Sequence, residues 1–96
     1  MGDLNLDLFI AYDISHSTID PFLTINRYFD KIKVIHLSNK DDRQNHLPIS
    51  TGKLPIYKIL KMLNKKGFYG VIVLEYLPEF FDKMICDYEI LNKVFG

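Results

Sequence analysis

Three short apolar runs divide this chain, and each has the length of a β-strand. They cover residues 6–13, 31–37 and 71–74. Neither Val34-Ile35 nor the run from Val71 to Leu74 alternates apolar with polar residues, which is typical of strands buried on both faces of a sheet. We therefore predict three strands, the second and third of which are covered on both faces.

Apolar residues spaced by three and four positions predict a helix after each run. The first helix begins at Pro21, with Asp20 as its N-cap. The second lies between Pro55 and Gly67, which suits the left-handed position after a helix. The third starts at Pro78. The expected buried stripes are Phe22, Ile25 and Phe29 in the first helix, Ile56, Ile59, Leu60 and Leu63 in the second, and Phe81, Met84, Ile85, Tyr88, Leu91 and Phe95 in the third.

The order of strand, helix, strand, helix, strand, helix predicts an α/β fold with parallel strands. Each connection is long enough to cross over a sheet and return in the same direction. Residues 38–52 separate the second strand from the second helix. Loops of this length without secondary structure are uncommon and often functional. We therefore expect a functional loop at residues 38–52.

Composition narrows the classes of function. The 12 basic and 12 acidic residues give a formal charge of zero, which disfavours nucleic-acid binding because phosphate contacts need a basic surface. No run reaches the roughly 20 apolar residues of a membrane span, and no signal-peptide pattern is present. Cys86 is the only cysteine, so an internal disulfide is excluded, and we expect a buried thiol. These features predict a single cytoplasmic domain over residues 1–96.

Three residues suited to metal binding stand at or near the carboxyl ends of the predicted strands: Asp13, His36 and Glu75. Ligands of parallel α/β folds bind at these ends. Two carboxylates and one imidazole suit a divalent ion such as Mn, Co, Zn or Mg. Each residue also has a structural alternative: a cap for Asp13, a hydrogen-bonded core position for His36, and a lysine partner for Glu75. Three coinciding strand ends favour a site.

Further candidates lie in the loops after the first two strands. His16 follows Asp13 by three residues and could reach the same cavity. Arg43 and His46 belong to the long loop, where an arginine suits a substrate phosphate or carboxylate. A plain solvated loop is an equally good interpretation of Arg43.

Four motifs in this chain resemble the C-terminal part of the xylose isomerase-like barrels, which include sugar phosphate isomerases and epimerases and are related to type IV apurinic endonucleases. The matching segments are Asp13-Ile-Ser-His16, His36-Leu-Ser-Asn39, His46-Leu-Pro-Ile-Ser-Thr-Gly52 and Gly70-Val-Ile-Val-Leu-Glu75. Each motif is weak alone, but their order and spacing together are fairly specific. The resemblance implies a partial TIM (β/α)₈ barrel made of three C-terminal βα units.

The same resemblance implies roles for the candidate residues. Asp13, His36 and Glu75 match the family's metal ligands. In the ketose epimerases the glutamate at the Glu75 position also transfers a proton at the carbon next to the carbonyl. The resemblance therefore predicts a sugar or sugar phosphate substrate, a divalent metal, and Glu75 as the catalytic residue.

Substrate contacts are expected from the loop residues. His16 matches a residue that contacts substrate in epimerases and metal in endonucleases, and Arg43 is similar in place to a substrate-contacting arginine. His46 matches a loop histidine that binds an additional zinc in the endonucleases. Gln44 stands where the endonuclease pattern has aspartate, which disfavours a trinuclear zinc nuclease.

The length of the chain sets a further expectation. A whole barrel has about 250 residues, whereas this chain has 96. We therefore interpret residues 1–96 as a C-terminal fragment. A further glutamate ligand would come from an earlier strand, so the chain is expected to be inactive alone. It would be completed by self-association or by a chain that supplies the other strands. A non-catalytic remnant or assembly module is the alternative.

Overall fold

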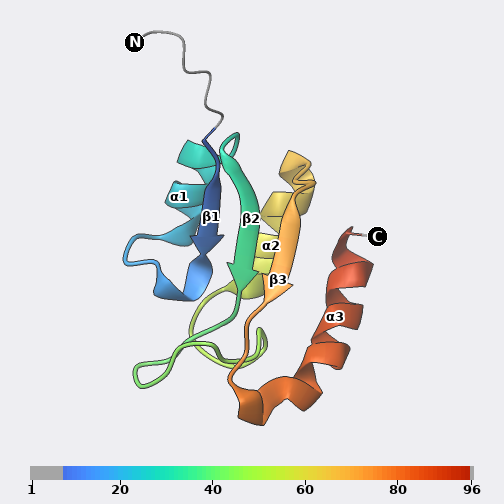
Figure 1. Cartoon of the computed structure of the whole chain (residues 1–96). Coiled ribbons are helices and arrows are strands. Elements are labelled where there is room, and N and C mark those ends of the chain that lie inside the picture. The colour runs from blue at the N-terminus through green and yellow to red at the C-terminus, as the bar shows by residue number, and fades with distance from the viewer. Residues whose placement is uncertain (1–7, 96) are drawn as a thin grey trace, which may run out of the picture.

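The three apolar runs form one parallel sheet. The computed structural model describes residues 8–95, and within them the strands are β1 (Ile10–Asp13), β2 (Ile32–Leu37) and β3 (Val71–Leu74). They lie side by side in the order β1-β2-β3 (Figure 1). The predicted parallel α/β arrangement is confirmed. The first strand is shorter than predicted, and residues 6–7 of that prediction lie outside the described residues.

The first two helices begin where the sequence predicts, whereas the third begins at Phe81, after a 3₁₀ turn that starts at the predicted Pro78. The helices are α1 (Pro21–Tyr28), α2 (Ile56–Lys66) and α3 (Phe81–Phe95), with short 3₁₀ turns η1 (Ile14–His16) and η2 (Pro78–Phe80). The Asp20 carboxylate accepts a hydrogen bond from the backbone N–H of Phe22 at 2.9 Å, so the predicted N-cap is confirmed. Gly67 ends α2 with φ 79°, as predicted. Of the helices in residues 8–95, none combines the length and hydropathy that crossing a bilayer requires.

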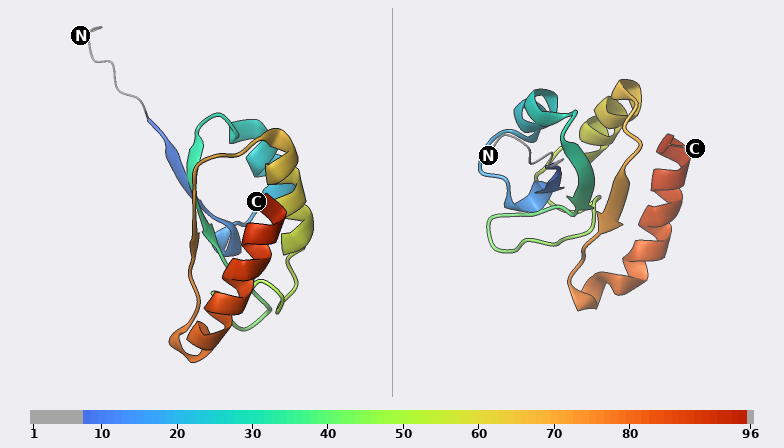
Figure 2. Two further views of the ribbon diagram at one scale, coloured as in Figure 1. Left: turned by 90° about the vertical axis from the view of Figure 1, so that its right-hand side faces the viewer. Right: turned by 45° about the horizontal axis from the view of Figure 1, so that its top comes forward.

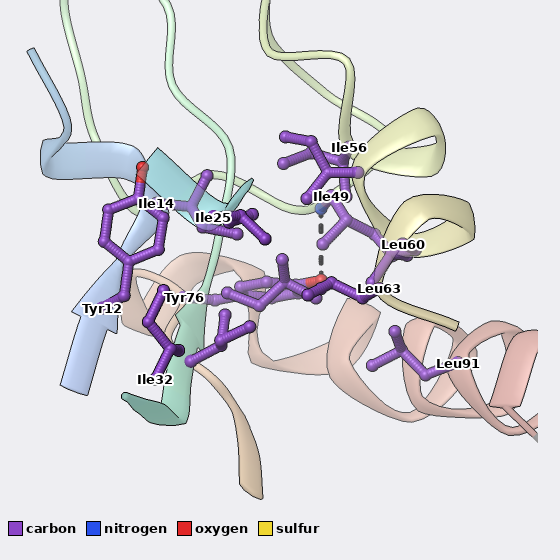
Figure 3. Close-up of a cluster of buried hydrophobic side chains, with 13 residues drawn as sticks. Tyr12, Ile14, Ile25, Ile32, Ile49, Ile56, Leu60, Leu63, Tyr76 and Leu91 are labelled. Atoms are coloured by element: carbon purple, nitrogen blue, oxygen red, sulfur yellow. Dashed lines mark hydrogen bonds between the residues drawn. The ribbon is translucent and has the colours of Figure 1, made fainter. Parts of the chain in front are cut away.

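All three helices lie on the same side of the sheet (Figure 2). Tyr12 pairs with Ile35, and Ile35 pairs with Ile72, so this row of side chains faces the helices. The core between the layers contains the four predicted α2 residues, Ile56, Ile59, Leu60 and Leu63, together with Tyr12, Ile14, Ile25, Ile32, Ile35, Leu37, Ile49, Tyr76 and Leu91 (Figure 3).

The other face of the sheet is open, which corrects the prediction for β2 and β3. Ala11, Val34 and Val71 form the row that points away from the helices. Val71 is 56% exposed and Val73 38% exposed, because no element of residues 8–95 covers this face. The prediction that both faces are covered is therefore wrong for β2 and β3 within the described chain, since Val34 of β2 lies on the same open face and is only partly buried.

The orientation of α3 also differs from the prediction. Leu91 is buried as expected, but Phe81, Ile85 and Tyr88 are exposed, and Asp87 is buried instead. The prediction of a buried Cys86 is likewise wrong, because its side chain is exposed. The helix lies beyond the edge of β3 (Figure 1) and turns Asp87 inward, where it meets Tyr76.

Tyr76 and Asp87 form a buried polar pair at the end of β3. The Tyr76 hydroxyl donates a hydrogen bond to Asp87 Oδ2 at 2.6 Å. The same hydroxyl accepts a hydrogen bond from the backbone N–H of Ile49 at 3.2 Å (Figure 3). Burial, and then the hydrogen bond to Asp87, raise the pKa of Tyr76 above its ordinary value of 10.0.

This raised pKa predicts a loss of stability in alkali. Above pH 10 the unfolded chain releases the Tyr76 proton while the folded chain keeps it, so the free energy of unfolding falls as pH rises. The limiting slope for one group is about 1.4 kcal/mol per pH unit. Urea unfolding between pH 9 and 11 should show a steeper fall in the wild-type chain than in Tyr76→Phe, with a difference that approaches this slope at the upper end of the range. Equal slopes would contradict the prediction.

Candidate metal site at the carboxyl edge of the sheet

The three predicted strand-end residues lie on the same side of the sheet. Asp13 pairs in register with His36, and His36 pairs with Val73. Glu75 follows Val73 by two residues, so its side chain points to the same face. The backbone N–H of Glu75 donates to the Leu37 carbonyl at 3.2 Å, which continues the ladder past the end of β3. The parallel register thus brings Asp13, His36 and Glu75 together on the helix-free face.

These three side chains form a compact set of potential ligands. His36 Nδ1 contacts Glu75 Oε1 directly. One ligand atom from each of Asp13, His36 and Glu75 can be chosen so that all lie within 4.8 Å of one another. Ligand atoms at about 2.0–2.2 Å from one ion are separated by at most about 4.4 Å, so small side-chain rotations suffice. The donor set and its spacing fit a divalent ion.

A second group shares Asp13 with the first. It contains Asp13, His16 and His46, whose ligand atoms also lie within 4.8 Å of one another. The Nε2 atoms of His16 and His46 are 3.1 Å apart, a separation that suits either an N–H···N hydrogen bond or two ligands of one ion. His46 Nδ1 lies 3.8 Å from Glu75 Oε2. His46 is therefore close to both groups.

The contacts do not match the cap alternative for Asp13 or the lysine-partner alternative for Glu75, whereas His36 is hydrogen-bonded, to Glu75. Asp13 precedes η1, but its carboxylate accepts from the Ser15 hydroxyl at 3.0 Å and caps no backbone N–H of that turn. His36 is partly exposed. Among the described residues the side-chain contacts of Glu75 are to His36 and His46, and none is to a lysine. The roles of Asp13, His36 and Glu75 as metal ligands stay predictions.

Backbone geometry at His46 is unusual. Its φ is 60°, in the left-handed region, which costs an L-residue about 1–2 kcal/mol. Its carbonyl accepts a hydrogen bond from the Leu77 N–H at 2.9 Å, and the loop closes through paired backbone hydrogen bonds between Asn39 and Leu47. Such strain persists where the surroundings fix the chain, and it is concentrated at functional sites.

Arg43 lies in the exposed outer turn of the long loop. The Asp41 carboxylate accepts hydrogen bonds from the backbone N–H groups of Arg43 and Gln44, each at 2.8 Å. These two bonds hold the pKa of Asp41 below its ordinary value. Arg43 belongs to neither group of potential ligands, so its contact with substrate stays a prediction.

Two residues that support the site were not assigned a role from the sequence: Asn39 and Tyr76. The buried amide of Asn39 donates to the carbonyls of Ile49 and Leu54 at 3.0 and 3.3 Å. Its Oδ1 accepts from the N–H of Leu54 at 2.9 Å. The position of Asn39 inside one of the four motifs was the available signal. Tyr76 offered none, because a tyrosine after a strand reads as an ordinary core residue.

The parallel βα units define an α/β protein of the class that includes TIM barrels, with a polar cluster at the carboxyl ends of the strands, where such folds bind ligands. Comparison with known families is consistent with this class. The family described as xylose isomerase-like TIM barrel matches residues 4–82, and the chain belongs to that family. No curated protein and no solved structure matches the chain.

Proposed function

We propose that this chain is the C-terminal portion of a divalent-metal-dependent sugar or sugar phosphate isomerase or epimerase. The observation that carries the proposal is the convergence of Asp13, His36 and Glu75 at one edge of the sheet. Membership of the xylose isomerase-like TIM barrel family supports the same class of substrate. A cytoplasmic location belongs to this proposal and rests on the composition and the single cysteine.

Each residue has a defined part in the proposed reaction. Asp13, His36 and Glu75 would hold Mn, Co, Mg or Zn. The bound ion would polarise the carbonyl and neighbouring hydroxyl oxygens of an open-chain sugar. Glu75 would transfer the proton at the carbon next to the carbonyl. Its Oε1 contacts His36, which leaves Oε2 as the oxygen available for that proton.

Substrate binding is assigned to His16, Arg43 and His46. His16 and His46 stand beside the proposed metal ligands, with His16 Nε2 3.7 Å from Asp13 Oδ2. With an ion held by Asp13, the imidazole N–H groups of His16 and His46 would lie beside it and would donate to sugar hydroxyls. Arg43 would bind a phosphate or carboxylate by paired hydrogen bonds after a movement of the outer turn.

The chain alone is proposed to be inactive. Its helix-free face carries Val71 and Val73, and a groove of about 530 Å³ between β3 and α3 is lined by apolar residues such as Ile72, Leu74 and Met84. In a complete barrel this face and this edge are covered. We propose that further strands cover them, supplied by a longer chain or by a second copy.

Two alternatives have support from particular observations. The exposed apolar face favours a non-catalytic remnant or assembly module of the same fold. The short distance between the His16 and His46 Nε2 atoms favours an endonuclease-like second metal position. Gln44 and the zero formal charge weigh against the endonuclease.

A cobalt titration tests the proposal. Co²⁺ bound by Asp13, His36 and Glu75 should give visible absorption bands that saturate with a micromolar Kd. Adding a ketose phosphate should then change the bands, because its adjacent oxygens would enter the coordination shell. An equal concentration of inorganic phosphate controls for the anion alone. Absence of Co²⁺ binding would overturn the proposal. Co²⁺ bands that do not change when the ketose phosphate is added would favour the non-catalytic module.

A further inference from the structure

The Tyr76 hydroxyl joins three segments that are distant in sequence. Tyr76 follows the proposed ligand Glu75, Asp87 lies on α3, and Ile49 lies in the loop that carries His46. The hydroxyl donates to Asp87 Oδ2 at 2.6 Å and accepts from the Ile49 N–H at 3.2 Å. Tyr76 is 6% exposed and Asp87 4% exposed, so water does not compete for these bonds. Figure 3 shows the Tyr76 ring beneath the loop, with its hydroxyl directed at Ile49.

The loop needs such a restraint at this point. His46 has φ 60°, a conformation that a flexible loop would leave. Residues 76–77 contact the loop at two places three residues apart. The Leu77 N–H donates to the His46 carbonyl at 2.9 Å, and the Tyr76 hydroxyl holds the Ile49 N–H. The His46 backbone is therefore fixed against the same segment that carries Glu75.

Successive side chains of this segment point to opposite faces of the sheet, so that Glu75 belongs to the proposed site and Tyr76 to the core. Glu75 points to the helix-free face, where His36 contacts it, whereas Tyr76 points into the core between sheet and helices. A displacement of Tyr76 would therefore move Glu75 and release His46 together. The Asp87 carboxylate fixes the direction of the Tyr76 hydroxyl and leaves its lone pair aimed at the loop.

We infer that Tyr76 and Asp87 are positioning residues, which fix His46 relative to Glu75 and so set the geometry of the metal and substrate site. The inference rests on the proposed function for the identity of that site. It assigns a role to α3, which contributes none of the proposed ligands yet holds the loop through Asp87.

Three variants test the inference. Tyr76→Phe removes the hydroxyl and leaves the Ile49 N–H without its partner. Asp87→Asn keeps an oxygen that can accept from Tyr76, so it should behave like the wild-type chain. The double variant Tyr76→Phe with Asp87→Leu removes both polar groups, which should recover part of the lost Tm because no buried carboxylate is left unpaired. Loop positioning should not recover with it.

Two measurements separate positioning from general stability. In Tyr76→Phe and in the double variant, amide hydrogen exchange at Leu47, Ile49 and Leu77 should be at least tenfold faster than in the wild-type chain. The Kd for Co²⁺ should rise about tenfold, the range seen when groups that orient metal ligands are removed. The Co²⁺ absorption bands should also change. Ile25→Val is the control, because it lowers Tm from a buried site on α1 outside this network.

The outcomes are distinct. A Tyr76→Phe chain with wild-type exchange rates, Kd and bands would overturn the inference, as would an Ile25→Val chain that shows the same changes. If the wild-type chain binds no Co²⁺, the proposed function fails. Exchange at Leu47, Ile49 and Leu77 then still decides whether Tyr76 and Asp87 hold the loop.

Discussion

Replacing His36 with alanine is expected to weaken binding of Co²⁺ by at least about 100-fold. His36 supplies the single nitrogen ligand of the proposed set and also contacts Glu75 Oε1. Removal of a group that only orients a ligand typically costs about 10–100-fold in affinity, so loss of a ligand that also orients its neighbour should cost more. Calorimetric titration of both chains under identical buffer conditions measures the ratio of the two Kd values.

His16→Ala is the matched control for this experiment. His16 lies beside the same cavity but belongs only to the group with Asp13 and His46. Its removal should change the Kd of an ion held by Asp13, His36 and Glu75 by less than about threefold, because its one contact with this set is an exposed pairing with Asp13 at 3.7 Å, too long for a hydrogen bond. If His16→Ala abolishes binding and His36→Ala does not, the ion occupies the second group and the assignment of the ligands is wrong.

The convergence of Asp13, His36 and Glu75 could be anticipated from the sequence because parallel strands end at the same edge of a sheet. Only the lengths of three apolar runs had to be right for that conclusion. The meeting of His16 with His46 could not be anticipated in the same way. It depends on the path of residues 38–52, which is set by Asn39 hydrogen bonds and by the left-handed φ of His46. Contacts of this kind leave no periodic signal in the sequence.

The helices likewise include one feature that the hydrophobic pattern predicts and one that it does not. In α2 the predicted stripe of Ile56, Ile59, Leu60 and Leu63 is buried without exception, because the other positions of that helix are polar apart from Tyr57 and Met62. In α3 apolar residues surround much of the helix, so several rotations would bury a similar apolar area. One polar contact, from Tyr76 to Asp87, accompanies the orientation observed. The hydrophobic pattern therefore predicts which face of α2 is buried, but it does not determine which face of α3 is buried.

The exposed face of β3 has a different origin. Val71 and Val73 follow the pattern of a strand covered on both faces, yet no layer of residues 8–95 lies over them. The apolar pattern of β3 indicates that its residues are suited to a strand buried on both faces. Their exposure is consistent with a barrel interior that other strands would complete, and it agrees with the family to which the chain belongs.

Gly52→Ala is expected to lower the free energy of unfolding by about 2–5 kcal/mol, the sum of a strained φ and an overpacked contact. Gly52 has φ 126°, which L side chains rarely adopt. A Cβ at this position would stand 2.6 Å from the Lys40 carbonyl oxygen and 2.7 Å from Asn39 Oδ1. Relief of either clash would disturb Asn39, which holds the loop at Ile49 and Leu54.

Gly67→Ala serves as the comparison variant, because it introduces a side chain at a positive φ without an overpacked contact. Gly67 also has a positive φ, 79°, but a Cβ there would meet no atom within 4 Å. Its replacement should therefore cost only the conformational part, about 1 kcal/mol. Urea unfolding of both variants measures the difference, which combines the greater strain of φ 126° with the close approach of Gly52 to the Lys40 carbonyl oxygen and the Asn39 side chain. Equal losses would mean that the loop yields easily at Gly52, and a yielding loop could not hold His46 in its strained conformation.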